Sequence, residues 1–375
     1  MSNSSRVYGL DILRAYAILI VVAVHSQDLL LEKNILRQVI TFFSTDGVSL
    51  FFVLSGFLIG GILIRTIYET EFTSKELFNF WIRRWFRTLP AYFLVLVFFI
   101  IYNLYTQVNP NPLPWFNFLT FTQNFASPPP LHFFEEAWSL SVEEWFYLII
   151  PFALYLSLRF TAFEKNKIIL FWICVIIVLV TLLRTYKAYK FNYYSAEEWD
   201  NNLRKQVVTR LDSLMYGFLG AYLNYYCQIK IARNSKIALF IIGLSILFIP
   251  NINDYLLHEF MWNRIIYRNY FELTMVPLGT LLLFPLLLAI KTGKGIIYKS
   301  ITFISLISYS LYLTHSSLIR WIIMPALNEK ISFSAPVYYV LYFVISIGLA
   351  YVLYNYYEKP MTRLRDVVGK KKTDG

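Results

Sequence analysis

The first apolar stretch of the chain carries ionisable side chains at spacings that suit acid–base chemistry. Asp11, Arg14 and His25 lie within or beside a run apolar enough to cross a membrane, where charged groups are costly and usually functional. On a helix Arg14 and His25 share one face, separated by roughly 16 Å along the axis. Asp11 lies about 40° from His25, and Asp28 follows about one turn later. A lone membrane histidine usually bonds a neighbouring helix, but this charged stripe favours a functional face.

A second group of polar side chains begins the apolar run near residue 138, in AWSLSVEEWFYLIIP. Ser139 and Glu143 are four residues apart, as are Glu143 and Tyr147, so each pair shares a helix face. Glu143 and Glu144 point about 100° apart, so at least one of them should face protein. We expect that residue to be Glu143.

Three arginines precede a proline in NFWIRRWFRTLPAYF. Arg83, Arg84 and Arg87 are suited to phosphate, because a guanidinium donates two parallel hydrogen bonds to it. Anchoring at the inner membrane surface is an alternative explanation for the same residues. Both interpretations place this segment just before a transmembrane helix that starts near Pro90.

Other apolar runs also contain polar or small residues with specific uses. Arg210 and Asp212 begin TRLDSLMYGFLGAYL, where we expect an ion pair inside a helix bundle. His315 in ISYSLYLTHSSLIRW is a second histidine within the membrane. In FFVLSGFLIGG, Gly56 and Gly60 are four residues apart, which predicts close packing of two helices.

The composition requires a membrane to hold these residues. Of 375 residues, 57% are hydrophobic and 15% charged, whereas an ordinary soluble domain is about 25% charged. A soluble fold cannot bury that much apolar surface, but a bilayer can. The net charge of +11 does not indicate nucleic acid, because Lys and Arg fall mainly in short segments between apolar runs. The two cysteines have no spacing suited to a metal or a disulfide framework, and we expect no metal.

Runs long enough to span about 30 Å of hydrocarbon recur along the whole chain. No linker, repeat or low-complexity tract divides them, so we expect one membrane-embedded domain over about 9–360 and a short basic tail. The fold class is therefore all-α, a polytopic integral membrane protein with a bundle of about ten transmembrane helices. The expected spans are 9–31, 47–68, 90–107, 138–158, 167–186, 207–227, 236–250, 269–290, 299–325 and 335–357.

Basic residues predict the orientation of this bundle. Lys and Arg are more frequent in the segments that share a side with the N-terminus, which favours a cytoplasmic N-terminus and C-terminus. We expect a multi-pass protein of the inner (cytoplasmic) cell membrane. Residues 108–136 then form an outer segment rich in proline and aromatic residues, either an extended cap that contacts sugar or an interfacial loop.

These pieces together resemble a known family. From GLDILRAYAILIVVAVHS at 9–26 to YYEKP at 356–360, the chain is similar to membrane acyltransferase family 3. Members of that family are O-acyltransferases of surface polysaccharides, lipopolysaccharide O-antigens and macrolide antibiotics. The shared order is Asp–x–x–Arg, ten residues and His; FFVLSGFL; RRxxR–x–x–P; WSLSVEExFY; RxDxLxxG; YSLYLxH; and Glu–x–Pro.

The chain departs from the family pattern at a few positions, and none removes an ionisable group. Ile12 and Ala15 replace glycines that commonly flank the Leu–Arg pair, and Ser317 stands where a proline is frequent. The extracellular SGNH hydrolase-like domain of some members is not expected here, so the resemblance implies a single-component acyltransferase.

The resemblance implies a mechanism. His25 would act as general base on a sugar hydroxyl or accept the acyl group transiently. Arg14 would orient the donor or stabilise developing negative charge, and Asp11 would hold Arg14. Glu143 would be a further catalytic residue at a central cavity. The residues that would line this cavity are Ser139, Tyr147, Arg210, Asp212 and His315. Acetyl-CoA, or another acyl-CoA, would be the cytoplasmic donor substrate, and its phosphates would bind the three arginines of RRWFR.

The acceptor and the rival functions stay open at this point. A lipopolysaccharide, capsule, exopolysaccharide, lipid-linked saccharide or small macrolide would each fit, with acetyl the family's commonest acyl group. A transporter or flippase of a lipid-linked saccharide would use the same topology, although we find none of the internal repeats common in transporters. A non-catalytic assembly partner would leave the charged stripe unexplained. Direct transfer, an acyl-histidine intermediate and the oligomeric state are not distinguished.

Overall fold

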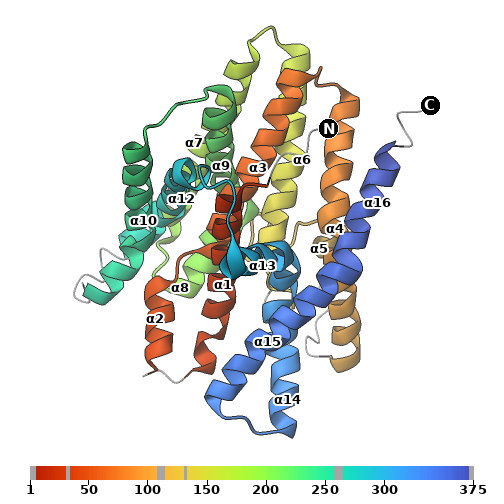
Figure 1. Cartoon of the computed structure of the whole chain (residues 1–375), viewed down its shortest axis with the longest axis vertical. Helices are drawn as coiled ribbons and strands as arrows, with labels where there is room; N and C mark the ends of the chain where they lie inside the picture. Colours follow the sequence, from red (N-terminus) through yellow and green to blue (C-terminus); the bar gives the residue numbers. More distant parts are fainter. Residues whose placement is uncertain (1–5, 31–33, 108–114, 131–132, 257–264, 371–375) are drawn as a thin grey trace. The chain divides into compact units, whose positions relative to one another are not determined.

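The computed structural model describes residues 6–30, 34–107, 115–130, 133–256 and 265–370. These residues form helices and connecting turns, with no strand among them, as expected for an all-α membrane protein (Figure 1). The α-helices are α1 Tyr8–Ser26, α2 Ile35–Phe43, α3 Gly47–Glu69, α4 Ser74–Thr106, α5 Trp115–Leu119, α6 Ala137–Phe160, α7 Lys165–Phe191, α8 Ala196–Trp199, α9 Leu211–Ala221, α10 Arg233–Leu256, α12 Leu273–Leu287, α13 Gly295–Thr314, α14 Met324–Lys330, α15 Ala335–Leu353 and α16 Lys359–Lys370.

Short segments of other helical types interrupt or extend these helices. Two are 3₁₀ turns, η1 Gln27–Leu29 and η3 Val207–Thr209. The others are π-helical, a form that is rare and often marks functional sites. They are η2 Asp200–Arg204, η4 Tyr222–Tyr226, η5 Tyr267–Glu272, η6 His315–Ile323 and η7 Tyr354–Glu358.

Eight helical segments of the described residues are long and apolar enough to cross a membrane. They are Tyr8–Leu29, Ile35–Glu69, Ser74–Thr106, Ala137–Phe160, Lys165–Phe191, Tyr267–Leu287, Gly295–Lys330 and Ala335–Leu364. The other two expected spans, 207–227 and 236–250, are helical as α9 with η4 and as α10, but they are not among the eight. The polytopic architecture is confirmed, while the count of ten and the side of each terminus remain predictions.

The expected start of a helix near Pro90 is wrong. Helix α4 begins at Ser74 and runs without a break to Thr106, with Pro90 inside it. The apolar pattern begins only near Pro90, but helical conformation extends back through the amphipathic arginine-rich stretch. Proline is tolerated within long membrane helices because neighbouring groups satisfy the backbone that it leaves unpaired.

Part of the proline-rich segment 108–136 is described. Residues 115–119 form the short helix α5, and the chain from 120 to 130 follows it in turns and irregular structure. Residues 108–114 and 131–132, where several of its prolines lie, fall outside the described residues. The proposed sugar-contacting cap therefore stays a prediction.

The chain forms two compact units, each assembled from separate stretches of sequence. The first unit comprises residues 1–65, 173–204 and 209–308, and the second comprises 66–172, 205–208 and 309–375. We describe each unit by itself.

The first unit depends on close approach of helix backbones. A side-chain carbon added to Gly56 of α3 would lie 1.8 Å from the Leu214 carbonyl oxygen of α9. One added to Gly217 of α9 would lie 1.9 Å from the Val53 carbonyl oxygen of α3. Because only glycine fits in both places, the predicted small-residue packing of FFVLSGFLIGG is confirmed.

The chain just after α12 holds the start of α1 in the same unit. The amides of Tyr8 and Gly9 donate hydrogen bonds to the carbonyls of Lys291 and Ile290, at 3.2 and 2.9 Å. The first amides of a helix have no partner within it, so these bonds satisfy two of them. This contact anchors the helix that carries Asp11, Arg14 and His25.

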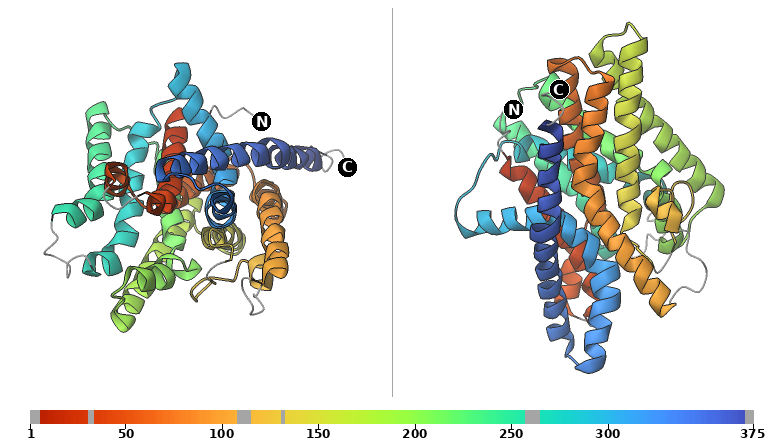
Figure 2. Two further views of the ribbon diagram at one scale, coloured as in Figure 1. Left: turned by 90° about the horizontal axis from the view of Figure 1, so that it is seen from below. Right: turned by 90° about the vertical axis from the view of Figure 1, so that its right-hand side faces the viewer.

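The second unit is arranged around α4 and α6. Helix α16 packs alongside α4, and α6 packs on another side of it. The right-hand view in Figure 2 shows α16 beside part of α4. These long helices position the arginines of α4 and the carboxylates of α6.

Candidate functional site

His25 lies in the last turn of α1 and is exposed. Its Nδ1 is 2.8 Å from the carbonyl oxygen of Val21, one turn earlier. A carbonyl oxygen can only accept a hydrogen bond, so Nδ1 carries the proton in the neutral ring. The lone pair is then on Nε2, and this tautomer is the one that a general base requires if Nε2 faces the substrate.

Asp11 and Arg14 lie near the other end of α1. Asp11 is buried, and its carboxylate accepts from Arg6 Nε at 2.5 Å and from Ser305 Oγ at 2.9 Å. Arg14 is half-buried on the same helix. Helix α1 is continuous from residue 8 to 26, so the spacing that places Arg14 and His25 on one face is realised. The structure therefore assigns Asp11 two partners that sequence spacing did not indicate, and its support of Arg14 remains a prediction.

Glu143 and Tyr147 contact each other on α6, as their four-residue spacing predicts. The Tyr147 hydroxyl donates to Glu143 Oε2 at 2.8 Å. Arg84 of α4 donates from Nη2 to the same hydroxyl at 3.0 Å, and its guanidinium lies over the Tyr147 ring, 4.6 Å from the centroid. Trp81 Nε1 donates to the Tyr147 carbonyl at 2.9 Å, which adds a further tie between α4 and α6. Tyr147 thus connects a cation and a carboxylate.

Glu144, rather than Glu143, is the more buried of the two adjacent carboxylates. Glu144 is only 9% exposed, and its Oε1 accepts from Thr88 Oγ1 of α4 at 2.9 Å, whereas Glu143 is half-buried. The Tyr309 hydroxyl donates to the Thr88 carbonyl at 2.7 Å. Both carboxylates therefore face protein: the expectation for Glu143 is confirmed by its bond from Tyr147, and Glu144, which we did not favour, is the more buried of the two. Spacing within one helix could not show this, because the partner of Glu144 is on another helix.

The three arginines of α4 do not share one environment. Arg84 contacts Tyr147, while Arg83 and Arg87 are exposed and one turn apart. Exposed guanidinium groups at this spacing can bind two phosphate oxygens of one ligand or of adjacent phosphates. The cluster therefore divides into one arginine that is packed within the unit and two that are accessible.

Ser139 and His315 belong to a buried polar cluster in the second unit. Ser139 Oγ is 2.6 Å from the Tyr312 hydroxyl, which also donates to the Glu136 carbonyl at 3.3 Å. His315 is fully buried, and its Nδ1 is 2.8 Å from the Tyr312 carbonyl. Like Nδ1 of His25, this nitrogen must donate, because its partner is a carbonyl.

Glu136 joins this cluster, and the sequence analysis did not single it out. Its Oε1 accepts the amides of Ser316 and Ser317, at 3.0 and 2.6 Å, and its Oε2 accepts from the Ser317 hydroxyl. These amides belong to the first turn of the π-helix η6. Burial raises the pKa of Glu136 to about 7, although the hydrogen bonds from Ser317 oppose that change. A proline, which is frequent in the family at position 317, has neither an amide hydrogen nor a hydroxyl to donate. The serine at this position was therefore the sequence signal that could have indicated the contact with Glu136.

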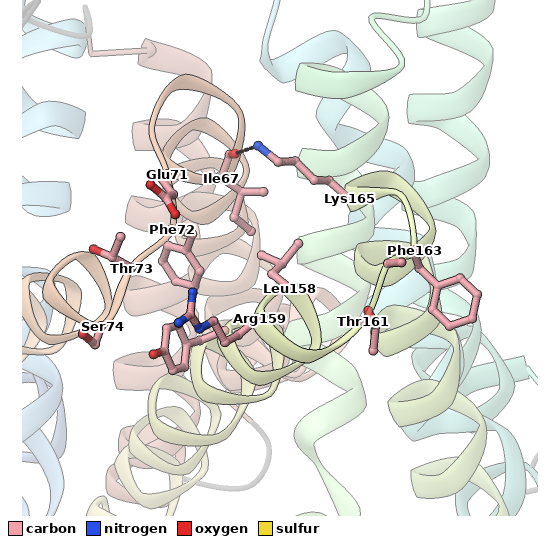
Figure 3. Close-up of a pocket in the computed structure, with 12 residues that line it drawn as sticks. Ile67, Glu71, Phe72, Thr73, Ser74, Leu158, Arg159, Thr161, Phe163 and Lys165 are labelled. Carbon is pink, nitrogen blue, oxygen red and sulfur yellow. Dashed lines mark hydrogen bonds between the residues drawn. The ribbon is translucent and has the colours of Figure 1, made fainter.

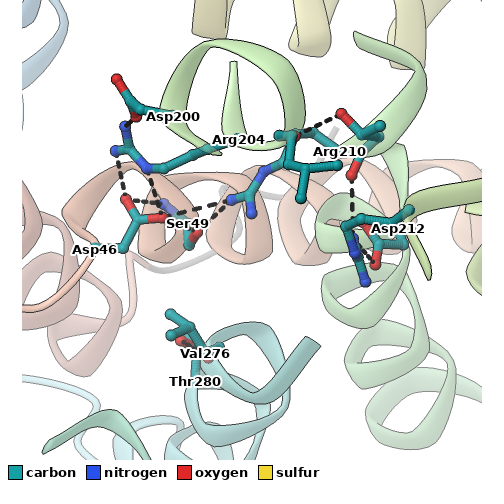
Figure 4. A network of polar contacts seen from close by, with 11 residues as sticks. Asp46, Ser49, Asp200, Arg204, Arg210, Asp212, Val276 and Thr280 are labelled. Atoms are coloured by element: carbon teal, nitrogen blue, oxygen red, sulfur yellow. Dashed lines mark hydrogen bonds and ion pairs between the residues drawn. The ribbon is translucent and has the colours of Figure 1, made fainter. Parts of the chain in front are cut away.

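Arg210 and Asp212 do not form the expected ion pair. Figure 4 shows that each has a different partner in the first unit. Asp212 accepts from Arg184 Nη1 at 2.8 Å, and both side chains are buried. Arg210 donates to Ser49 Oγ and lies 3.6 Å from Asp46.

Arg204 completes this network at the Asp46 end. Its guanidinium bonds Asp46 at 2.9 Å and Asp200 at 2.8 Å. Burial disfavours the charged form, but the two carboxylates raise the pKa of Arg204 above its ordinary value. Arg184 also donates to the Thr209 carbonyl and to Thr274 Oγ1, at 3.0 and 2.6 Å. These interactions connect α3, α7, α9 and α12, so Arg210 and Asp212 belong to a buried polar network, and the expectation that they line a cavity stays a prediction.

Within the described part of the chain, no group of three or more His, Cys, Asp or Glu residues is arranged to hold a metal ion. Two groups are suited to acid–base and electrostatic chemistry: the exposed imidazole of His25 in the first unit, and the Arg84–Tyr147–Glu143 contact in the second.

Several bacterial proteins are similar to this chain. O-acetyltransferase OatA of Staphylococcus aureus is 27% identical over 383 residues, which cover 95% of this chain and 57% of the relative. Peptidoglycan O-acetyltransferase OatA of Listeria monocytogenes is 31% identical over 42% of this chain and 25% of the relative. Putative peptidoglycan O-acetyltransferase YrhL of Bacillus subtilis is 34% identical over 38% of this chain and 23% of the relative.

The chain therefore spans between about a quarter and little more than half of the length of these relatives. No solved structure matches it. The family model of the acyltransferase domain matches residues 7–355, which is nearly the whole chain. The motifs from the Asp11 stripe to the final apolar helix thus all fall within one family domain, and the chain belongs to acyltransferase family 3.

Proposed function

We propose that this protein is a membrane O-acetyltransferase that moves an acetyl group from cytoplasmic acetyl-CoA to a hydroxyl of a surface or lipid-linked glycan. The observation that carries the proposal is the geometry of His25, an exposed imidazole whose Nδ1–H is directed to the Val21 carbonyl. Membership of an acyltransferase family and the names of the relatives support the same reaction class.

The proposed reaction uses Nε2 of His25 as the base. Nε2 accepts the proton of the acceptor hydroxyl as the hydroxyl oxygen bonds to the thioester carbonyl carbon. The carbon–sulfur bond then breaks, and the CoA thiolate leaves with that proton. The Nδ1–H bond to Val21 holds the ring in one orientation and stabilises the transient imidazolium. The alternative, in which Nε2 itself carries the acetyl group between donor and acceptor, uses the same tautomer.

The donor requires cationic groups, and we assign these to Arg83, Arg84 and Arg87. Arg83 and Arg87 are exposed and would bind the CoA phosphates, while Arg84 is held by Tyr147. Glu143 accepts from Tyr147 and so supports Arg84 through the tyrosine. Arg14 would stabilise the negative charge that develops on the thioester oxygen.

A glycan is the proposed acceptor, and peptidoglycan is the first to test, because two of the relatives are named peptidoglycan O-acetyltransferases. Lipopolysaccharide, other surface polysaccharides and a small macrolide are the other candidates. We place the protein in the cytoplasmic membrane with both termini in the cytoplasm, where acyl-CoA is made.

The test measures acetyl esters on the purified glycans by NMR in cells that lack the protein or carry one of three forms. These forms are the wild type, His25→Ala, and Tyr16→Phe as a control. Tyr16 is on the same helix, and its hydroxyl donates to the Phe43 carbonyl and contacts Thr45. We expect acetyl esters with the wild type and Tyr16→Phe, and none with His25→Ala present at an equal level in the membrane. An unchanged ester content together with altered amounts of surface glycan would instead favour transport.

A further inference from the structure

A cavity of about 620 Å³ lies in the second unit (Figure 3). It is formed where α6 ends and α7 begins, together with the last turn of α3 and the start of α4. Its volume is within the usual range of small-molecule sites. Its polar lining residues are Glu71, Thr73, Ser74, Arg159, Thr161 and Lys165.

Two cations face this cavity, against one carboxylate. Lys165 is held in place, because its Nζ donates to the Ile67 carbonyl at 2.6 Å and lies over the Tyr68 ring. Arg159 lines the same cavity, and no described residue forms an ion pair or a hydrogen bond with its guanidinium. Glu71 is the acidic lining residue. The lining therefore carries a positive charge with one guanidinium available to a ligand.

The start of α4 adds neutral donors to the same wall. Thr73 and Ser74 both line the cavity, and the Thr73 side chain does not cap the helix. Amides of the first turn have no partner within a helix, and the helix dipole favours negative charge beside them. Hydroxyls, first-turn amides and a guanidinium together suit a phosphate group.

A stripe of apolar side chains leads along α6 to this cavity. Phe152, Leu156 and Phe160 follow at four-residue spacing and are 45%, 36% and 77% exposed. Residues at that spacing share one helix face, so the stripe presents apolar surface to the bilayer up to Arg159. Phe163, which lines the cavity, is 73% exposed. A ligand with a phosphate headgroup and hydrocarbon chains would use the cavity and the stripe together.

We propose that this cavity binds the headgroup of an anionic phospholipid of the cytoplasmic leaflet, with Arg159 as its principal phosphate ligand and the stripe Phe152, Leu156 and Phe160 beside its acyl chains. Basic pockets at the inner ends of membrane helices recognise such headgroups. The four helix ends lie on the side that the basic residues assign to the cytoplasm. A water-soluble nucleotide would gain nothing from the stripe, which is why we favour a lipid over the donor substrate.

The experiment titrates the full-length detergent-solubilised protein with dioleoyl-phosphatidylglycerol and, in parallel, with dioleoyl-phosphatidylcholine. Native mass spectrometry counts the lipids that each protein molecule retains. We expect the wild type to retain phosphatidylglycerol in preference to phosphatidylcholine. Arg159→Gln should weaken phosphatidylglycerol binding about five-fold, the effect of removing one cation near a phosphate.

A matched control is Lys167→Gln. Lys167 is in the same connection, but it pairs with Glu164 at 3.2 Å and does not line the cavity. It should retain wild-type binding, and Phe160→Ser should weaken retention without any change of charge. Equal affinity of Arg159→Gln and Lys167→Gln would overturn the proposal. Displacement of phosphatidylglycerol by free CoA, lost in Arg159→Gln, would also overturn it and make the cavity a nucleotide site. The lipid proposal does not depend on acyl transfer, so neither result bears on His25.

Discussion

His25 and His315 are two histidines in membrane helices with the same local hydrogen bond and opposite surroundings. In both, Nδ1 lies 2.8 Å from a backbone carbonyl of the preceding turn, of Val21 in α1 and of Tyr312 in α13. Both rings therefore have the tautomer with its lone pair on Nε2. His25 is exposed at the end of an α-helix, whereas His315 is fully buried at the start of the π-helix η6.

The difference shows that the tautomer alone does not make a catalytic base. In the proposed reaction the base must reach a hydroxyl of a glycan acceptor, and of these two rings the exposed one of His25 meets that requirement. His315 is surrounded by a cluster in which Tyr312, Ser139 and Glu136 bond one another. We therefore propose a chemical role for His25 and, because His315 contacts the cluster that bonds the first turn of η6, a positioning role for His315.

The largest expected effect is a difference in acetyl-transfer rate between variants of the two histidines. His25→Gln should lower the rate of acetyl transfer about 10²- to 10⁴-fold, the usual contribution of a general base. His315→Gln should lower it less than about ten-fold, because the buried ring acts through packing rather than on substrate. The measurement is acetyl transfer by purified protein in lipid vesicles, with acetyl-CoA and a glycan acceptor.

Thermal unfolding of the same preparations is the control for this pair. His315→Gln should unfold at a lower temperature than the wild type, because it disturbs a buried contact, while the exposed His25→Gln should not. If both variants lost the same fraction of the acetyl-transfer rate without loss of stability, the proposed difference between the two histidines would be wrong. Both rings would then take part in the reaction.

The second effect concerns the carboxylate that holds η6. Glu136→Ala leaves the Ser316 and Ser317 amides and one hydroxyl buried without their acceptor, and it should cost about 1–3 kcal/mol of stability. Glu136→Gln keeps an oxygen for the amides and should cost much less. Glu135→Ala, at the half-buried neighbouring position, is the matched control. Chemical unfolding in detergent measures all three, and a similar loss in Glu135→Ala would assign the effect to the loop instead.

The same carboxylate predicts a pH dependence of stability. Burial raises the pKa of Glu136 from 4.5 to about 7 in the folded protein. Between these values the folded protein holds a proton that the unfolded chain has lost, so stability falls as the pH rises. The wild type should therefore unfold more easily at pH 8 than at pH 5, by more than Glu136→Gln does. A wild type that gains stability over this interval relative to Glu136→Gln would show that the ionised carboxylate is the favoured form.

Contacts within one helix were predictable, and contacts between helices were not. The four-residue spacing of Glu143 and Tyr147 correctly gave their contact. Asp212 was expected to pair with Arg210, two residues away, but its partner is Arg184 of α7. Nothing in the spacing of one helix shows which distant cation approaches it, because helix packing decides that.

Some features of the fold were likewise predictable from the sequence, and others were not. The apolar runs correctly predicted membrane-spanning helices, and the glycines of FFVLSGFLIGG correctly predicted a close helix contact. The structure shows that this contact is between Gly56 and α9. The start of α4 at Ser74 and the π-helix at His315 were missed. Hydropathy indicates where a helix enters lipid, not where its hydrogen bonding begins. A π-helix differs from an α-helix in that its backbone hydrogen bonds join residues five apart instead of four, and a short segment of this kind does not show in the spacing of apolar residues.

The smallest expected effect tests whether the cluster around His315 is structural. Tyr312→Phe removes a hydroxyl that is 2.6 Å from Ser139 Oγ and 3.3 Å from the Glu136 carbonyl, but it keeps the ring. We expect a loss of about 0.5–1.5 kcal/mol of stability, the usual net worth of such bonds. The acetyl-transfer rate should change less than about three-fold, because neither lost bond involves His25. A rate loss approaching that of His25→Gln, at unchanged stability, would instead make the Tyr312 hydroxyl part of the proton path and return His315 to the candidates for catalysis.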